Sequence, residues 1–480
     1  MTLLEFIPQK KFYILITNFF LGLFLAFSFE PYNVPFLSLI IIGLYFLLND
    51  YAFEKFQDHY KIFFFNGILF GFGFFLLSMY WVSNSILEYD SELFYVAPLI
   101  AIFFPLFISI FFGVMQIVNA FYWSESNSKI FYFSLVWSLF EFFRSFLFTG
   151  LPWNLIGYSW SWSLSYSQLV SIFGIYGLGL ITVFCSVCIF SYLSNSKNKP
   201  YFIFAIIVLI LFYVYGTFRI NSNQTIYSEN ELRIVHTFFD QKEKWTRQSI
   251  EKTAAMGSPE LVTVFPETSF GYNSNIPSNW IVGYIRKDRD YYFNSLKYKD
   301  VIYDKKILVP FGEYFPLSNL FNYMFPENSY FQNELTKGDY DQLFNSYILP
   351  LICYEIIFPS FVHNGVSDDT NLLVNISNDG WFGKFSGPRQ HFVHAQFRSI
   401  ELGIPLARSS NKGISGLISP IGEIIKFTNS NENMYLDVKI PNKLKSTIYR
   451  EYGNLLTYFL IVLFFIIGYA IQLKKNMYYE

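Results

Sequence analysis

The sequence predicts a polytopic α-helical membrane bundle of about eight spans, joined to an α/β domain. Hydrophobic residues make up 53% of the chain and charged residues only 15%, whereas an average soluble domain carries roughly a quarter charged residues. Of the 34 Lys and Arg residues, 23 lie between Arg233 and Arg450, and that segment alternates strand-like and helical patterns. We therefore expect a bundle over residues 1–220, the α/β domain over 221–450, and a last span with a tail over 451–480.

Eight apolar stretches are candidates for membrane spans. They lie at residues 12–29, 35–49, 62–82, 94–119, 130–148, 168–193, 200–218 and 455–473. A helix that crosses a hydrocarbon layer of about 30 Å needs about 20 residues, so the second stretch is short. The first stretch has a basic flank but continues into further spans, which is typical of an anchor rather than a cleaved signal.

Lysine placement predicts how the spans are oriented. Loops 49–61, 120–129 and 194–199 contain lysines, and loops 30–34, 83–93 and 149–167 contain neither Lys nor Arg. Lysines also flank the first and last spans, at Lys10, Lys11, Lys474 and Lys475. Because short cytoplasmic loops are enriched in Lys and Arg, we expect both termini in the cytoplasm. The α/β domain would then lie on the opposite side.

The charged segment predicts a layered α/β domain with a buried sheet. Expected strands lie at residues 231–239, 261–266, 306–310, 347–353, 372–377, 405–409, 416–419 and 434–440. The best helical pattern runs from Pro388 to Leu402 and ends at Gly403, a residue suited to a helix C-terminus.

Three ionisable residues interrupt apolar runs of this segment. Glu267 follows the run 261–266, Lys305 precedes the run 307–310, and Cys353 follows the run 347–352. Cys353 is the only cysteine between residues 221 and 450, so it has no disulfide partner within the domain. An unpaired cysteine in an exported domain is a candidate reactive thiol.

These residue types together point to acyl transfer through a cysteine. A thiol attacks a carbonyl as the thiolate, which requires a base or a cation nearby. The carboxylate of Glu267 can act as general base, and the ammonium of Lys305 can stabilise an oxyanion, a contribution of about 3 kcal/mol. The backbone N–H after Cys353 is a possible second donor, and Glu313 and Glu355 are carboxylates that could orient Lys305. Taken singly, each residue also fits a structural role.

Longer segments around these residues carry a family resemblance. They are residues 264–268, 303–316, 351–355, 375–383, 390–391, 398–401 and 411–415, together with 141–144 and 149–154 in the membrane part. The chain resembles the apolipoprotein N-acyltransferase family, polytopic bacterial membrane enzymes with a nitrilase-type domain of the carbon-nitrogen hydrolase superfamily. That resemblance implies an α-β-β-α sandwich for the second domain.

The resemblance also assigns site residues. It implies a catalytic triad of Glu267, Lys305 and Cys353. Active-site support falls on Glu313, Tyr354 and Glu355, and a tryptophan on a mobile arm falls on Trp245. The arm departs from the family, because the Gly-Asn that usually follows the glutamine is missing after Gln241. This departure concerns the lid and substrate entry rather than the chemistry.

The implied reaction has two steps in a bacterial inner membrane. The cysteine takes an acyl chain from a phospholipid, expected to be phosphatidylethanolamine, and passes it to the α-amino group of an S-diacylglyceryl-cysteine at a lipoprotein N-terminus. The resemblance implies no metal and no dissociable cofactor. No basic run indicates nucleic-acid binding, and we expect a monomer.

Three further pairs of residues lie outside these assignments. They are Glu141 with Arg144, Cys185 with Cys188, and His391 with His394. The first pair lies in a predicted span, where charge is costly, so it predicts an internal ion pair or a contact with lipid headgroups. Small-residue packing in a helix is expected of the cysteines. The histidines lack a third metal ligand at a suitable spacing, which favours packing or hydrogen bonding.

Two alternative functions remain open at the level of sequence. In a membrane-anchored amidase of the nitrilase type, water would replace the lipoprotein amine. A non-catalytic membrane scaffold that kept the fold is disfavoured, because all three triad positions are occupied by the required residue types.

Overall fold

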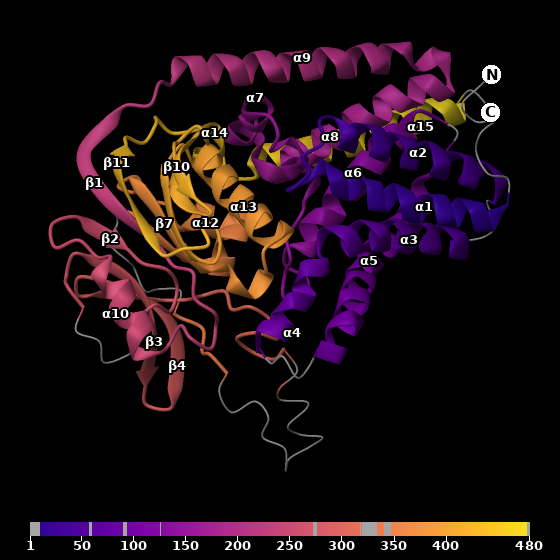
Figure 1. The fold of residues 1–480 in the computed structure, drawn as a ribbon. Coiled ribbons are helices and arrows are strands. Elements are labelled where there is room, and N and C mark those ends of the chain that lie inside the picture. The colour runs from indigo at the N-terminus through magenta and orange to yellow at the C-terminus, as the bar shows by residue number, and fades with distance from the viewer. Residues whose placement is uncertain are drawn as a thin grey trace. The chain divides into compact units, whose positions relative to one another are not determined.

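A computed structural model describes residues 10–56, 60–89, 94–124, 126–271, 276–316, 318, 334–339 and 347–477. The chain divides into two compact units (Figure 1). One unit comprises Met1–Ser222 and Thr447–Glu480, and the other comprises Asn223–Ser446.

The first unit is helical. Seven of its described helical segments are long and apolar enough to cross a membrane: Lys11–Ser28 (α1 with η2), Leu37–Lys55 (α2), Tyr60–Ser78 (α3), Ala97–Tyr122 (α5), Val170–Ser194 (α8), Ser196–Ser222 (η6 with α9) and Leu455–Lys475 in α15. Shorter helices are α4 (Asn84–Tyr89), α7 (Leu164–Ser167) and α14 (Ile448–Tyr452). The second stretch, which looked short in sequence, extends to Lys55.

The stretch predicted as a span at 130–148 forms α6, Ser128–Arg144, which at 17 residues is shorter than expected. It rises about 26 Å, just under the ~30 Å hydrocarbon thickness. α6 packs against α5, α8 and α15, so protein rather than lipid surrounds much of it. The polar side chains of α6 make it less apolar than the seven segments named above. Its packing against other helices explains how those side chains are tolerated.

Glu141 and Arg144 of α6 bind the backbone of the segment that follows. The Ile156 N–H donates to the Glu141 carboxylate at 2.9 Å. Arg144 Nη1 donates to the carbonyls of Leu151 and Trp153 at 3.0 and 2.8 Å. Both charged side chains therefore tie α6 to residues 151–156 inside the helical unit.

The second unit contains two sheets. One has the strand order β11-β1-β2-β3-β4-β5 and the other β10-β9-β8-β7-β6. The bounds are β1 Tyr227–His236, β2 Val262–Val264, β3 Trp280–Asp288, β4 Tyr291–Tyr298, β5 Val301–Asp304, β6 Ile348–Ile352, β7 Leu372–Asn378, β8 Leu406–Asn411, β9 Ser415–Ile418, β10 Ile424–Thr428 and β11 Met434–Pro441. Strands β6, β7 and β8 are parallel, as are β1, β2 and β3.

The main apolar core lies between the two sheets. Alternate residues of the first sheet, such as Ile234 and Val264, meet Val374 and Ile376 of β7 in one buried cluster. Their neighbours Val235 and Phe265 face the other way and pack with residues of α10 (Arg247–Ala255). α12 (Pro359–Gly365) and the largely buried α13 (Ser386–Leu402) belong to the second sheet's side (Figure 1). This arrangement is the expected α-β-β-α sandwich.

The strand prediction was wrong around Lys305. The strand expected at 306–310 does not form; β5 ends at Asp304, and Lys305 follows it. The N–H groups of Lys306 and Ile307 donate to the buried Glu355 carboxylate instead of to a neighbouring strand.

The β3–β4 hairpin was also missed. Its strands carry many charged and polar residues, which masked the apolar alternation, and its two-residue turn begins at Arg289, whose φ is +54°. A left-handed conformation at a hairpin turn is common, but arginine is an unusual residue for it, so the sequence carried no turn signal there.

Candidate active site

The candidate site lies where strands of both sheets end. Glu267 follows β2, Lys305 follows β5, and Cys353 follows β6 directly. In open parallel sheets, ligand sites form at the carboxyl ends of strands. The fold therefore brings together three residues that are 38 and 48 positions apart in sequence.

Cys353 sits in a left-handed turn between β6 and a short helical turn. Its φ is +49°, a conformation that non-glycine residues adopt in only a few per cent of cases. Backbone strain of this kind clusters at functional sites. Only 5% of the cysteine is exposed, and Ser377 Oγ lies 3.3 Å from its sulfur.

Lys305 is held between two carboxylates. Its Nζ lies 2.8 Å from Glu313 Oε1 and 3.3 Å from Glu267 Oε1. Asn294 on β4 links the same two acids, since its amide nitrogen donates to Glu267 at 2.7 Å and to Glu313 at 2.8 Å. The Val309 N–H donates to the second oxygen of Glu313 at 2.8 Å. Glu313 and Asn294 thus fix the position of Lys305 and Glu267.

These contacts set the charge of the acid and the amine. Burial alone would raise the pKa of Glu267, but the ammonium groups of Lys305 and Lys244 outweigh it, so the pKa lies below its usual value. Burial alone would lower the pKa of Lys305, but Glu313 and Glu267 outweigh it and raise the pKa. Near neutral pH, Glu267 is therefore ionised and Lys305 is cationic.

The thiol rests in its neutral form. Burial, together with the carboxylates of Glu267 and Asp379, raises the pKa of Cys353 to about 12, against the opposing effects of Lys305 and Ser377. A hydrogen bond from Cys353 also contributes to the low pKa of Glu267. An ionised base in contact with a protonated thiol is the pairing that general-base activation requires.

Glu355 joins the segments that carry Cys353 and Lys305. Its carboxylate accepts hydrogen bonds from the N–H groups of Ile352 at 2.7 Å and Lys306 at 2.7 Å, and from the Tyr303 hydroxyl at 2.9 Å. It is fully buried, and burial raises its pKa to about 7 despite these bonds. Its role here is to position the backbone on both sides of the site. Tyr354, between Cys353 and Glu355, is buried, with its ring edge-on to Phe358.

Lys244 is a second buried amine at the site, and it was not predicted from sequence. Its Nζ donates to the Glu267 carbonyl oxygen at 2.7 Å and to Thr268 Oγ1 at 2.5 Å. Burial lowers its pKa to about 8, with Glu267 and Cys353 opposing that change. Trp245 follows it with a ring 45% exposed, 5.8 Å from the Lys244 nitrogen.

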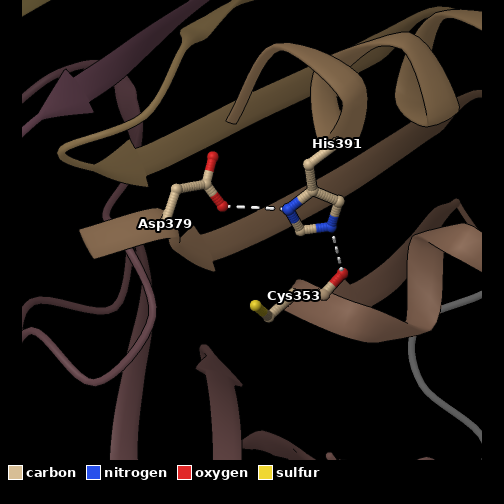
Figure 2. A group of neighbouring side chains, drawn as sticks. All are labelled: Cys353, Asp379 and His391. Carbon is tan, nitrogen blue, oxygen red and sulfur yellow. Dashed lines mark hydrogen bonds and ion pairs between the residues drawn. The ribbon is translucent and has the colours of Figure 1, made fainter. Parts of the chain in front are cut away.

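Cys353, Asp379 and His391 offer ligand atoms within 4.8 Å of one another. Figure 2 shows that the Cys353 carbonyl oxygen, and not the sulfur, faces the imidazole, and that His391 lies between Asp379 and that oxygen. Asp379 also forms an ion pair with Arg408 at 2.8 Å. A metal ion would have to displace that guanidinium and both imidazole hydrogen bonds, so this donor set does not fit a metal centre.

Part of the site was predicted from sequence. The structure brings together the buried Glu267, Lys305, Cys353 and Glu355 and the partly buried Glu313. Missed residues with direct contacts to that group are Lys244, Asn294, Ser377 and His391, and Asp379 and Arg408 bind Ser377 and His391 from behind. Asp379 lies in the 375–383 segment that carried the resemblance, which was the available signal. His391 was noted for its spacing from His394 and as part of the 390–391 segment of the resemblance, without a role in the site.

The site combines a thiol, a carboxylate base and an ammonium at the edge of a two-sheet sandwich, and the chain has membrane-spanning helices. Together these features define a membrane-bound enzyme of the carbon-nitrogen hydrolase class. Residues 211–449 match the family model described as carbon-nitrogen hydrolase. Residues 21–188 match the one described as the apolipoprotein N-acyltransferase N-terminal domain.

Two named relatives are similar to this chain over most of its length. An apolipoprotein N-acyltransferase of Rickettsia bellii is 32% identical over 85% of this chain and 89% of its own length. One from Wigglesworthia glossinidia brevipalpis is 29% identical over 95% and 98%. A solved structure, Saccharomyces cerevisiae Nit3 of the nitrilase superfamily, aligns at 15% identity and a TM-score of 0.32 over 44% of this chain and 90% of its own. The chain belongs to the apolipoprotein N-acyltransferase family, and it is a multi-pass bacterial membrane protein.

We expect Cys353 to be alkylated slowly by iodoacetamide. With a thiol pKa of about 12, the reactive thiolate fraction at pH 8 is roughly a thousandfold below that of an ordinary cysteine of pKa near 9. The rate should keep rising up to the highest pH at which the protein remains folded. Peptide mass spectrometry of Cys353, with a free cysteine peptide as control, measures it; a rate that levels off near pH 7 would contradict the neutral thiol.

Lys244→Met should move the acid limb of the acyl-transfer pH profile to higher pH. The substitution removes one of two ammonium groups that lower the pKa of Glu267, and such a neighbour shifts a carboxylate by about one unit or more. Glu267 then becomes protonated at a higher pH and loses its function as a base. Lys242→Met, an exposed lysine of the same segment, is the matched control and should leave the profile in place.

Proposed function

We propose that this protein transfers a fatty acyl chain from a phospholipid to the α-amino group of the S-diacylglyceryl-cysteine at a lipoprotein N-terminus. The acyl chain would travel as a thioester on Cys353. The observation that carries the proposal is the buried group of Glu267, Lys305 and Cys353 in a chain of this family. We take phosphatidylethanolamine as the donor and a monomer as the working unit.

In the first half-reaction, Glu267 takes the proton of Cys353 as the sulfur attacks an ester carbonyl of the phospholipid. The negative charge that develops on the carbonyl oxygen is stabilised by the Lys305 ammonium and by the Tyr354 N–H. When the intermediate collapses, the C–O bond breaks and the lysophospholipid oxygen takes the proton from Glu267. A thioester remains, and Glu267 is again ionised.

In the second half-reaction, the lipoprotein amine attacks the thioester carbonyl and gives a proton to Glu267. The same donors stabilise the second oxyanion. Collapse breaks the C–S bond, and the sulfur recovers a proton from Glu267 as the amide forms. No proton is gained or lost over the cycle, so one carboxylate serves both halves.

We assign supporting roles to the surrounding residues. Glu313, with Asn294, fixes the position of Lys305 relative to Glu267. Glu355 holds the backbone that flanks Cys353. Trp245, beside the buried Lys244 and largely exposed, would contact substrate as part of a lid.

We also propose that α6 crosses the membrane as an eighth span. With eight spans, both termini would lie on one side of the membrane and Asn223–Ser446, after the seventh span, on the other. The lysine-bearing loops support the cytoplasm for the termini and the periplasm for Asn223–Ser446. In cells with a permeabilised outer membrane, a membrane-impermeant maleimide should label Glu432→Cys, an exposed position of the second unit. Lys197→Cys, exposed in a lysine-bearing loop, should react only after lysis. The reverse pattern would contradict the orientation.

Trapping the acyl-enzyme tests the proposed chemistry. Purified protein incubated with phosphatidylethanolamine carrying a labelled acyl chain should acquire label that hydroxylamine releases, as a thioester does. Cys353→Ala should acquire none. Addition of an S-diacylglyceryl-cysteinyl peptide should move the label to the amine of that peptide.

The same experiment separates the alternatives. Label that passes to water as free fatty acid at an unchanged rate, with or without the peptide, would identify a hydrolase. Absence of any thioester in the wild-type protein would sink the proposal.

A further inference from the structure

Four buried residues form a hydrogen-bonded network behind the nucleophile: Ser377, Asp379, His391 and Arg408. Asp379 is its centre. It accepts from the Ser377 hydroxyl at 2.6 Å and from Arg408 Nη2 at 2.8 and 3.0 Å, and lies 2.9 Å from His391 Nδ1. All four side chains are fully buried. Unlike Lys305 and its two acids, this network lies on the β7, β8 and α13 side of Cys353.

The network reaches Cys353 at two atoms. Ser377 Oγ lies 3.3 Å from the sulfur, and His391 Nε2 lies 3.2 Å from the backbone carbonyl oxygen. Because Asp379 is an acceptor only, the Ser377 hydroxyl hydrogen points to Asp379. The imidazole, as Figure 2 shows, bridges Asp379 and the carbonyl oxygen of the nucleophile.

The proton on His391 can be assigned from its partners. The Cys353 carbonyl oxygen can only accept, so a hydrogen bond there requires the proton on Nε2. In the neutral ring, Nδ1 then accepts from Arg408 Nη2 at 3.0 Å. If the ring were charged, Nδ1 would donate to Asp379 instead. In both states Nε2–H donates to Cys353, so the contact persists whichever charge the imidazole carries.

This contact fixes the peptide that links Cys353 to Tyr354. A trans peptide is planar, and its C=O and N–H point in opposite directions. With the carbonyl held toward His391, the Tyr354 N–H is directed away from His391. In Figure 2 the carbonyl oxygen of Cys353 faces the imidazole and the sulfur does not. The contact of His391 therefore holds the peptide and leaves the sulfur free to attack a carbonyl that the N–H can also reach.

We propose that His391, held by Asp379 and Arg408, is a positioning residue for the oxyanion site: it fixes the 353–354 peptide so that its N–H meets the developing oxyanion. The inference rests on the proposed acyl transfer through Cys353. His391 moves no proton in the reaction. It acts through the peptide, and a hydrogen bond on the carbonyl also polarises the N–H as a donor.

Two substitutions separate the contacts of His391. His391→Asn places an amide near the position of Nδ1, which keeps the contact with Asp379 and loses that with the Cys353 carbonyl. His391→Gln is one carbon longer, so its amide reaches the position of Nε2 and can donate to that carbonyl. Each variant is measured for the single-turnover rate of thioester formation from labelled phosphatidylethanolamine and for the rate of iodoacetamide alkylation of Cys353. Thermal unfolding of each variant reports its stability.

We expect His391→Asn to slow thioester formation by about 10- to 100-fold, below the 10²- to 10³-fold loss that follows deletion of an oxyanion donor. Alkylation should change less than about threefold, because displacement of iodide forms no oxyanion and the thiol environment is kept. His391→Gln should restore most of the rate of thioester formation, even if its unfolding temperature is as low as that of His391→Asn.

Three results would overturn the inference. Equal slowing in both variants would mean that the Nε2 contact does not matter. A parallel fall in alkylation would mean that His391 acts on the thiol or on the fold. A wild-type protein that is alkylated at Cys353 but forms no thioester would overturn the proposed function itself, and it differs from the first two results because the wild-type signal is missing.

Discussion

A buried ammonium is the constraint on which the rest of the site depends. Lys305 is 1% exposed, and an isolated charge at that depth would be prohibitively costly. Two carboxylates, Glu267 and Glu313, make the position tenable. The carboxylates are tolerable in turn because Lys305 and Asn294 bind both of them, and the Lys244 ammonium adds a favourable charge beside Glu267. Removal of one partner would leave a buried charge uncompensated. The strands β2, β4 and β5 serve to bring these groups to one place.

The neutral thiol follows from the same arrangement. Lys305 is committed to two acids, so it cannot hold Cys353 as a thiolate, and burial with nearby carboxylates raises the thiol pKa to about 12. In the proposed reaction, the sulfur therefore becomes nucleophilic only when its proton passes to Glu267 while charge moves onto a substrate oxygen near Lys305. Proton transfer and attack would then be coupled by the electrostatics of the site. A resting thiol of this kind is also less prone to oxidation or chance alkylation than a stabilised thiolate.

The features that could be predicted from sequence are those that leave a physically strong pattern in it. Long apolar stretches, the fully buried strand β7 and the alternating strand β11 were predicted within a few residues. The β3–β4 hairpin was missed because tyrosines and polar or charged residues make up more than half of its strands, although it carries Asn294, which links the two acids. Lys305 was placed before a strand rather than after one, because Glu355, 50 residues away, takes the N–H groups that a strand would use. His391 joins the site only through tertiary contacts, and nothing in local sequence records them.

The choice between an amine and water as the final acceptor depends on what reaches the thioester. Glu267, Lys305 and Cys353 are 5%, 1% and 5% exposed, and exclusion of water protects a reactive intermediate from hydrolysis. In the proposed cycle Glu267 returns to its ionised form when the lysophospholipid leaves, and its low pKa keeps it so. The base is therefore ready before the acceptor arrives, and either nucleophile would be activated equally well by it. Selectivity for the lipoprotein amine must then come from access rather than from chemistry. An acceptor carrying two acyl chains is concentrated at the bilayer that anchors this chain, so its local concentration favours the amine.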